Sequence, residues 1–285
     1  MTSIRIAVAQ GVGTRAQIPD GVSIREHGRR IRELMTVAAD GGARLISFTE
    51  GALSAYPDKR WLSRDPDRLA ESDWSRVDWA VLSEELAATV EHAGDVGVWA
   101  VVGSAHRDVG SARPFNSLYV ISGTGQLVSR YDKRYLSPSE STYMYAAGDH
   151  PTVFEVDGFR FACALCCEAC MPEVFIEYET LATDCVLIGG GDPRLAKANA
   201  LLTGMWIAFA APGSDGSGVA SPDDRWLATR TSDGTPSVVF ADLDPHAMRA
   251  GYDRGYRPWR AYFRQNSHCP TPAEVTAMLE PPRQT

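Results

Sequence analysis

Apolar positions along the chain change their spacing several times, and each change predicts a new element. Residues 4–10 form a mostly apolar run of strand length. At residues 24–39 the apolar side chains recur every three or four positions, the spacing of one helix face, and Gly41–Gly42 supplies a helix end. Residues 43–48 are again a short apolar run, leading into Glu50. The opening of the chain therefore predicts a strand, a helix and a second strand.

The same alternation continues to residue 244. Further helices are predicted at residues 77–93, ended by Gly94, after Pro172, and at 194–205. Further strands are predicted at residues 96–105, 116–122, 126–133, 152–156, 159–166, 185–190, 206–211, 225–230 and 237–244. Gly123–Gly125, Asp157–Gly158 and Asp233–Gly234 each separate two such runs, which predicts hairpin turns.

This order of elements is typical of an α/β protein. It predicts two similar halves, each a β-α-β-α-β run that ends in antiparallel strands. Because no low-complexity linker divides them, we expect one domain over residues 1–285. The segment 245–285 is rich in Arg, Tyr and Pro and holds Trp259. We expect it to be a tail that packs on the surface or on a neighbouring subunit.

The composition is that of an ordinary globular protein, with 44% hydrophobic and 22% charged residues. A formal net charge of −8 and the lack of a basic tract argue against nucleic acid or an anionic membrane as a partner. No apolar run reaches the roughly 18 residues of a membrane span, and the first residues predict a strand rather than a signal peptide. Six cysteines, four of them bunched, do not form the disulfide framework of a secreted protein. We therefore expect a reducing cytoplasm.

The bunched cysteines have zinc-ligand spacing within each pair, Cys163 with Cys166 and Cys167 with Cys170. The two pairs abut, however, without the spacer of about 12–20 residues that folds one pair onto the other. The first pair also lies in a predicted strand, where residues three apart point to opposite faces. A redox dithiol needs an exposed first thiol at a helix start, which only Cys167 with Cys170 satisfies. We expect no metal, and core packing for the strand residues Cys163 and Cys185.

The end of this strand is the strongest candidate site. The apolar run stops at Cys166, and Glu168 and the helix-opening Pro172 follow. Parallel sheets place their chemistry at such strand ends, and a nearby helix N-terminus favours a thiolate. Position alone does not distinguish Cys166 from Cys167 as the nucleophile. Six scattered histidines leave a Cys–His dyad open, although none lies in a motif.

Three stretches, in order, resemble motifs of the carbon–nitrogen hydrolase (nitrilase) superfamily. LISFTEGALSAYP at 45–57 is similar to the family's apolar strand ending in Pro-Glu and followed by a Gly-Tyr-Pro turn. SRYDKRYLSP at 129–138 is similar to its Tyr-Arg-Lys-x-His-Leu strand. LCCEACMPE at 165–173 is similar to its Ile-Cys-(aromatic)-(Asp/Glu)-x-x-x-Pro-Glu elbow. Weaker likeness covers nearly the whole chain.

The resemblance assigns roles to individual residues. It makes Cys166 the nucleophile, Glu50 the general base and Lys133 the conserved lysine. It makes Glu140 the auxiliary glutamate of the substrate pocket, and it adds the backbone N–H of Cys167 to Lys133 as an oxyanion donor. A thiol of pKa ~8.5 is mostly protonated at neutral pH and needs such a base. Without the resemblance, the sequence would predict a solvated carboxylate for Glu50 and a surface lysine for Lys133.

The resemblance also implies a fold and an activity. The fold is a four-layer α-β-β-α sandwich of two pseudo-equivalent halves, without cofactor or metal, assembled as a homodimer or a larger homo-oligomer. The activity is hydrolysis of a small amide or N-carbamoyl substrate at a non-peptide C–N bond, through a thioester, with release of ammonia or an amine.

Two alternatives remain open. The first is a nitrilase that converts a nitrile to an acid and ammonia, which the Cys-x-Glu-x-x-Met-Pro pattern from Cys166 favours. The second is an inactive homologue that binds a ligand or a partner. The chain departs from the family pattern at Thr49, where proline usually precedes the base, and at Cys167, where an aromatic usually follows the nucleophile. A short segment after residue 185 departs as well, so the sequence does not define the substrate.

Overall fold

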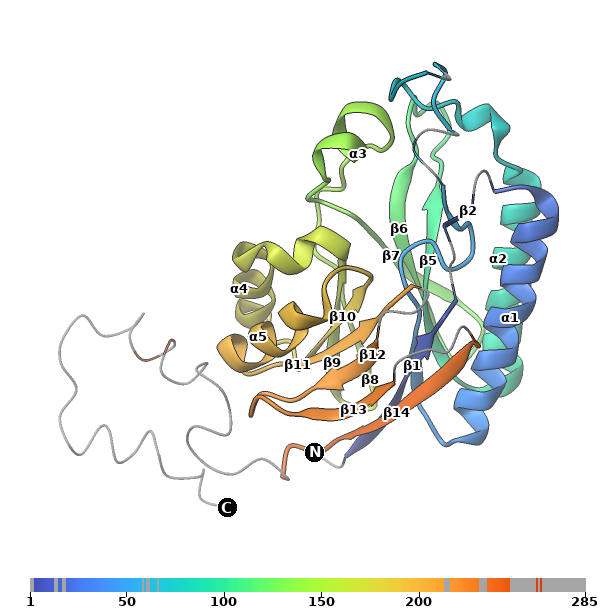
Figure 1. Ribbon diagram of the computed structural model, residues 1–285. Helices are drawn as coiled ribbons and strands as arrows, with labels where there is room; N and C mark the ends of the chain where they lie inside the picture. Colours follow the sequence, from blue (N-terminus) through green and yellow to red (C-terminus); the bar gives the residue numbers. More distant parts are fainter. Residues whose placement is uncertain are drawn as a thin grey trace.

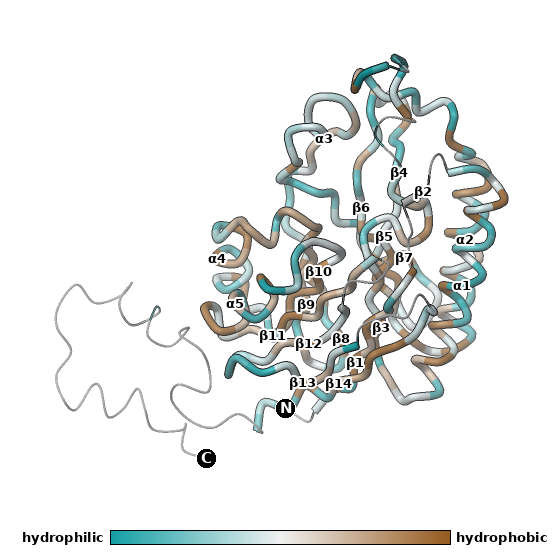
Figure 2. The backbone as a smooth tube through the Cα atoms, viewed as in Figure 1, coloured by the Kyte–Doolittle hydropathy of each residue, from teal (hydrophilic) through white to brown (hydrophobic). Residues whose placement is uncertain are grey.

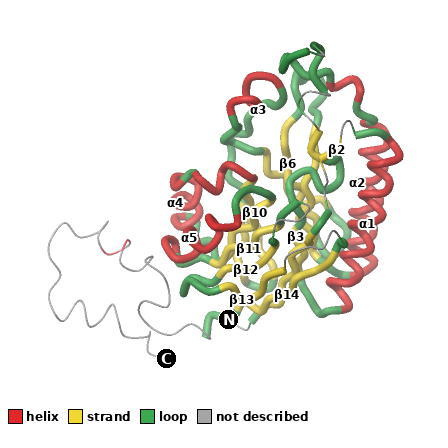
Figure 3. The backbone as a smooth tube through the Cα atoms, viewed as in Figure 1, coloured by secondary structure: helices red, strands yellow, loops and turns green. Residues whose placement is uncertain are grey.

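Two six-stranded sheets form the centre of the computed structural model, and helices cover their outer faces (Figure 1). The structure describes residues 3–12, 15–16, 19–57, 59, 62–65, 67–212, 216–230, 235–246, 260 and 262. Figure 3 shows the strands in the interior and the long helices outside. In Figure 2 the apolar residues gather on the strands, while hydrophilic residues alternate with apolar ones along the outer helices.

The first sheet has the order β14-β1-β3-β5-β6-β7. Its strands are β1 (Ile4–Gln10), β3 (Leu45–Ser47), β5 (Trp99–His106), β6 (Phe115–Ile121), β7 (Leu127–Asp132) and β14 (Ser237–Leu243). β1, β3 and β5 are parallel, and the other strands pair antiparallel. Helices α1 (Gly21–Asp40) and α2 (Trp79–Val96) pack on its outer face.

The second sheet has the order β13-β12-β11-β10-β9-β8. Its strands are β8 (Val153–Val156), β9 (Phe159–Leu165), β10 (Cys185–Gly189), β11 (Trp206–Ala210), β12 (Ser217–Ala220) and β13 (Trp226–Arg230). β9, β10 and β11 are parallel, and helices α4 (Pro172–Thr180) and α5 (Pro193–Thr203) cover the outer face. Each half therefore has the predicted β-α-β-α-β core.

Smaller elements complete the described chain. They are β2 (Arg15–Ala16) and β4 (Tyr56–Pro57), which pair with each other, the 3₁₀ helices η1 (Trp74–Arg76) and η2 (Cys166–Cys170), and α3 (Pro138–Tyr143).

Three apolar cores separate four layers, as predicted. Ile6, Val8, Phe161, Cys163 and Leu187 belong to the core between the two sheets, where interior packing requires side chains from both faces to interdigitate. The other two cores lie between each sheet and its helix pair. The sequence pattern explains this, because central parallel strands are covered on both faces and read as continuous apolar runs.

Several boundaries differ from the sequence prediction. α2 continues through Gly94 to Val96, and Gly97 caps it with a φ of 70°, the left-handed conformation of a C-cap glycine. The strands β13 and β14 do not pair with each other: β13 pairs with the unpredicted β12, and β14 pairs with β1 over its whole length. β14 pairs with the free edge of β1, and across that pair Arg5 Nε donates to Asp242 Oδ1 at 2.8 Å. The Asp233–Gly234 turn lies outside the described residues.

The two hairpin turns predicted around Gly123–Gly125 and Asp157–Gly158 are present, and both Asp157 and Gly158 have positive φ. Most of the predicted tail lies outside the described residues. Within that segment, Arg260 pairs with Glu179 on α4 and donates to the Leu202 carbonyl on α5. No described helix is long and apolar enough to cross a membrane.

Candidate active site

Cys166 lies at a sharp turn between a strand and a helix. β9 ends at Leu165, Cys166 has a φ of +49°, and the 3₁₀ helix η2 begins there. A non-glycine residue in the left-handed region is uncommon and is often associated with a functional site. Gly191 packs against this turn so closely that a Cβ there would lie 2.7 Å from the Cys166 carbonyl oxygen. Only glycine permits the loop after β10 to approach the turn this closely.

The buried carboxylate of Glu168 holds the turn in place. Oε2 accepts a hydrogen bond from the Leu165 N–H at 2.7 Å, and Oε1 accepts from the Tyr131 hydroxyl and the Arg134 N–H, both at 2.8 Å. The Tyr135 N–H donates to Oε1 as well, at 3.1 Å. Burial raises the pKa of Glu168, and these four donors oppose that effect. Glu168 therefore joins the turn of the second sheet to the segment that follows β7 in the first.

Lys133 is the centre of a buried charge cluster. It follows β7 directly, and its side chain is 1% exposed. Its Nζ donates to Glu50 Oε1 at 3.1 Å and to the two oxygens of Glu140 at 2.9 and 3.0 Å. Glu140 lies on the short helix α3, where the N–H of Ser137 also donates to its Oε2 at 2.8 Å.

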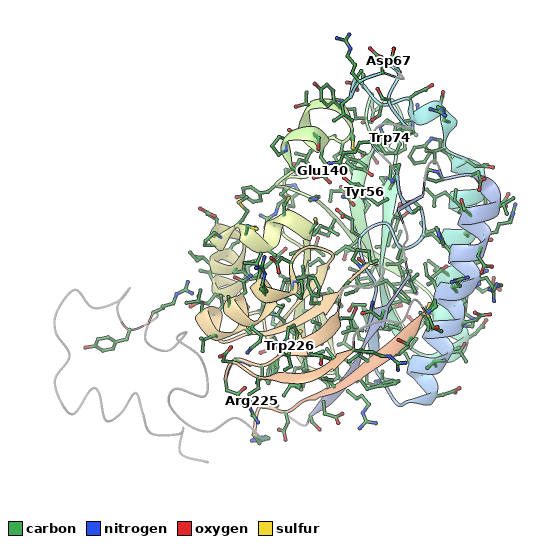
Figure 4. The ribbon with its side chains drawn as sticks, in the orientation of Figure 1. Tyr56, Asp67, Trp74, Glu140, Arg225 and Trp226 are labelled. Atoms are coloured by element: carbon green, nitrogen blue, oxygen red, sulfur yellow. The ribbon has the colours of Figure 1, made fainter. Side chains whose placement is uncertain are left out.

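Two further side chains donate to these carboxylates. Asn116, the second residue of β6, donates to Glu50 Oε1 at 2.7 Å, and its Nδ2 lies 3.4 Å from Glu140 Oε1. The Tyr56 hydroxyl donates to Glu140 Oε1 at 3.1 Å. Figure 4 shows the labelled Tyr56 and Glu140 close together beside the upper part of the first sheet. Two negative charges and one positive charge are thus surrounded by neutral donors.

The loop that carries Glu50 passes over a glycine of the neighbouring strand. It leaves β3 at the carboxyl edge of the parallel strands and runs across β5. A Cβ at Gly103 would lie 2.1 Å from the Thr49 carbonyl oxygen, a contact that no side chain tolerates. Glu50 consequently sits close to the inter-sheet core while its side chain reaches Lys133.

Burial and neighbouring charges set the protonation states of Lys133, Glu140 and Cys166. Burial opposes the charge of Lys133, but Glu50 and Glu140 attract it more strongly and raise its pKa above the ordinary range. Burial would raise the pKa of Glu140, but Lys133 holds it below its ordinary value. Burial and the charge of Glu50 raise the pKa of Cys166 to about 12, and Lys133 only partly opposes them. The resting thiol is therefore protonated and needs a base to remove its proton.

Cys167, beside Cys166, has a backbone contact of its own. Its Sγ contacts the Tyr135 carbonyl oxygen at 3.2 Å, and burial raises the pKa of this half-buried thiol. Cys163 and Cys185 lie in the inter-sheet core, as predicted for packing residues. Within the described residues, no three His, Cys, Asp or Glu side chains converge in a geometry that would hold a metal ion.

Of the described histidines, His27 contacts the Leu53 carbonyl, His92 contacts Thr36, and His106 contacts Tyr119 and Asp108. His150 lies near Asp149. None of these contacts involves Cys166, so they provide no evidence for a Cys–His dyad.

The structure brings together Glu50, Lys133 and Glu140, and it places the Cys166 thiol within electrostatic reach of all three. Three contributors were missed by the sequence analysis: Asn116, Tyr56 and the bracing role of Glu168. The Tyr56 position was visible, because it lies in the first family-like stretch. Asn116 lies in a stretch of weaker likeness, but a single amide near the start of an apolar strand gave no sign of a role in the site.

Comparison with known proteins identifies the class. The sequence profile of the carbon–nitrogen hydrolase family matches residues 6–252. The chain therefore belongs to the carbon–nitrogen hydrolase family, and it is a hydrolase. No curated protein sequence matches the chain significantly.

Several solved structures have a similar fold. An amidase from Nesterenkonia sp. has a TM-score of 0.72 at 19% identity, over 93% of this chain and 96% of that one. A variant of the amidase from Nesterenkonia sp. AN1 in complex with butyramide gives 0.71 at 17% identity, over 96% of both chains. Another variant carries the acetamide moiety of fluoroacetamide on its active-site cysteine and gives 0.71 at 18% identity, over 92% and 96%. At these identities the likeness concerns the fold, the nitrilase-type α/β sandwich expected from the sequence.

Because four hydrogen bonds converge on Glu168, we expect its replacement to lower both stability and turnover. Glu168→Gln replaces one acceptor oxygen by an amide that cannot accept, so at least one buried donor loses its partner. We expect the free energy of unfolding to fall by about 1–3 kcal/mol and kcat to fall at least tenfold, because the turn at Cys166 loosens. Denaturant unfolding and steady-state kinetics measure the two effects.

Glu177→Gln is the matched control, because its partly exposed carboxylate pairs with Arg134 on the same segment. We expect it to change the unfolding free energy by less than about 1 kcal/mol. Equal effects of the two substitutions on kcat would contradict the bracing role of Glu168.

Proposed function

We propose that the protein hydrolyses the C–N bond of a small amide or N-carbamoyl compound through a thioester on Cys166. The observation that carries the proposal is the buried Lys133, paired with Glu50 and Glu140 beside a strained strand-end cysteine. Membership of the carbon–nitrogen hydrolase family supports the reaction class. The amidase neighbours, one with butyramide bound, support a small amide as substrate.

The protonated state of Cys166 determines the first step. A thiol with a pKa of about 12 has a thiolate fraction of about 10⁻⁵ at pH 7. Spontaneous ionisation therefore supplies too little nucleophile, and a general base must take the proton during attack. We propose Glu50 as that base: its carboxylate accepts the thiol proton while the sulfur bonds to the carbonyl carbon.

The negative charge that develops on the carbonyl oxygen then needs donors. Lys133 has three N–H groups, and its two near-equal distances to Glu140 allow one of them to be shared between both carboxylate oxygens. A further N–H is then free for the oxyanion, together with the backbone N–H of Cys167. Collapse breaks the C–N bond, and Glu50 returns its proton to the leaving ammonia or amine.

The thioester is hydrolysed by the reverse sequence of proton transfers. Glu50 accepts a proton from water as the water attacks the acyl carbon, the C–S bond breaks, and the proton passes to the Cys166 sulfur. Glu140 does not move a proton in this scheme. We propose that it holds Lys133 and orients the substrate, because it already accepts from Lys133, Tyr56 and the Ser137 N–H.

Replacement of the two adjacent cysteines tests the nucleophile. Cys166→Ala should abolish release of ammonia from a panel of small amides, because no atom remains to form the thioester. Cys167→Ala is the matched control and should retain at least about a third of wild-type turnover, since only its backbone N–H is used. Activity in Cys166→Ala with loss in Cys167→Ala would move the nucleophile by one residue.

The same assay distinguishes the alternatives. Ammonia from nitriles but not from amides would identify a nitrilase, which the Cys-x-Glu-x-x-Met-Pro pattern favours. If neither panel releases ammonia and no thiol probe labels Cys166, the protein is an inactive homologue that binds a ligand or a partner.

The base and the cation are tested by substitutions that keep side-chain volume. Glu50→Gln cannot accept a proton, and Lys133→Met removes the positive charge from between two carboxylates. We expect kcat/KM to fall by about 10²–10⁴ in each. Circular dichroism should show that both variants remain folded, and wild-type kcat/KM in either would remove that residue from the mechanism.

We also propose a homodimer through α4 and α5, in a reducing cytoplasm. Ile176 and Leu202 are exposed apolar side chains on these helices, and the described cysteines are free thiols. Replacement of both residues by Glu should shift the mass measured by light scattering to that of a monomer. Val22→Glu, at an exposed site on α1, should not. A monomeric wild-type protein would contradict the proposal.

A further inference from the structure

Asn116 contacts each residue of the charge cluster, the two glutamates through its side chain and Lys133 through its backbone. Its side chain, on a residue that is 2% exposed, donates to Glu50 Oε1 at 2.7 Å and lies 3.4 Å from Glu140 Oε1. Its main-chain carbonyl accepts the N–H of Lys133 at 2.8 Å. One residue of β6 therefore holds the backbone of the cation and the side chain of the candidate base at the same time.

The two oxygens of Glu50 are made unequal by this contact. Oε1 accepts from both Lys133 and Asn116, whereas Oε2 accepts no hydrogen bond from the described residues. Oε2 is the oxygen next to the glycine loop that follows β10: a Cβ built on Gly190 would lie 3.6 Å from it. The next residue of that loop, Gly191, packs on Cys166. The unbonded oxygen thus faces the nucleophile side of the site.

We infer that Asn116 is a positioning residue that selects Glu50 Oε2 as the oxygen that exchanges protons with Cys166 and the substrate. The inference rests on the proposed role of Glu50 as the general base. Asn116 suits this task because its amide is a neutral donor that keeps its protons at any pH, so it can still donate to Oε1 after Oε2 is protonated. If the carboxyl rotated, the acquired proton would face Lys133 instead of the leaving group.

Lys133 alone does not provide this restraint. Its flexible side chain also contacts both oxygens of Glu140, and in the proposed reaction one of its N–H groups turns to the oxyanion. The ammonium is then shared among Glu50, Glu140 and the oxyanion, whereas the Asn116 amide donates to Oε1 without contacting the oxyanion. The residue therefore acts when the proton transfer takes place, and its loss should lower kcat more than it raises KM.

Asn116→Leu tests the inference, because leucine has a similar size and no donor. We expect kcat on the best amide to fall about 100-fold with KM changed less than threefold, as for a base misplaced by about 1 Å. A second measurement needs no turnover: the rate at which iodoacetamide alkylates Cys166, followed by fragmentation mass spectrometry. We expect this rate to fall at least tenfold at pH 7.5.

Asn116→Asp adds a charge at the same position. The titratable or charged groups around Glu50 and Cys166 are Lys133, Glu140, Cys167, Tyr56 and Tyr145. The new carboxylate cannot donate to Glu50 Oε1 and repels its negative charge, so kcat and the alkylation rate at pH 7.5 should fall at least as far as in Asn116→Leu. A packing role for Asn116 would lower stability without this loss of rate.

Ser117→Ala is the matched control, because Ser117 is the next buried residue of β6 and donates to Asp132 instead of the charge cluster. It should lower the unfolding midpoint and leave kcat within about threefold and the pH profile unchanged. Wild-type alkylation rate and kcat in Asn116→Leu, measured on folded enzyme, would overturn the inference. If wild type hydrolyses neither amides nor nitriles, the proposed function fails, and the alkylation comparison still decides the role of Asn116.

Discussion

The burial of the Lys133 ammonium is the constraint on which the rest of the site depends. Removing a charge of this size from water costs several kcal/mol even after relaxation, and Lys133 is 1% exposed. Glu50 and Glu140 compensate for that cost, but two carboxylates around one ammonium leave an excess negative charge. Asn116, Tyr56 and the Ser137 N–H supply the neutral donors that this excess requires. The groups therefore form one unit, in which no member can be removed without leaving a partner unpaired.

The unit is assembled from both sheets, so their relative position must be accurate. Glu50, Asn116 and Lys133 belong to the first sheet, and Cys166 follows a strand of the second. The inter-sheet core sets the spacing of the layers. Glu168 adds polar bonds that cross between them, because it accepts from residues on both sides. Close backbone contacts at Gly103 and Gly191 remove the remaining freedom of the two loops.

The sequence predicted most of the helices, strands and site residues that leave a periodic pattern or a motif. Amphipathic helices such as α1 and continuous apolar strands such as β9 and β10 were identified because burial imposes their pattern. α3 and β12 were missed because each is too short to show a period. The pairing of β14 with β1 was missed because strand partners far apart in sequence leave no local signal. The motifs pointed to Glu50, Lys133 and Glu140. Asn116 was missed for the same reason as the β14–β1 pair, because its role is recognisable only where three segments meet around it.

The charge of the cluster explains why a protonated thiol suits this site. Glu50, Glu140 and Lys133 together carry one net negative charge, and a free thiolate would add a second in a poorly solvated place. This is why burial and Glu50 raise the pKa of Cys166. Transfer of the thiol proton to Glu50 avoids the cost, because one carboxylate is neutralised as the thiolate forms and the net charge stays the same. The nucleophile is then generated only when an electrophile is present to receive it. The same carboxyl group holds the proton that the departing nitrogen will need.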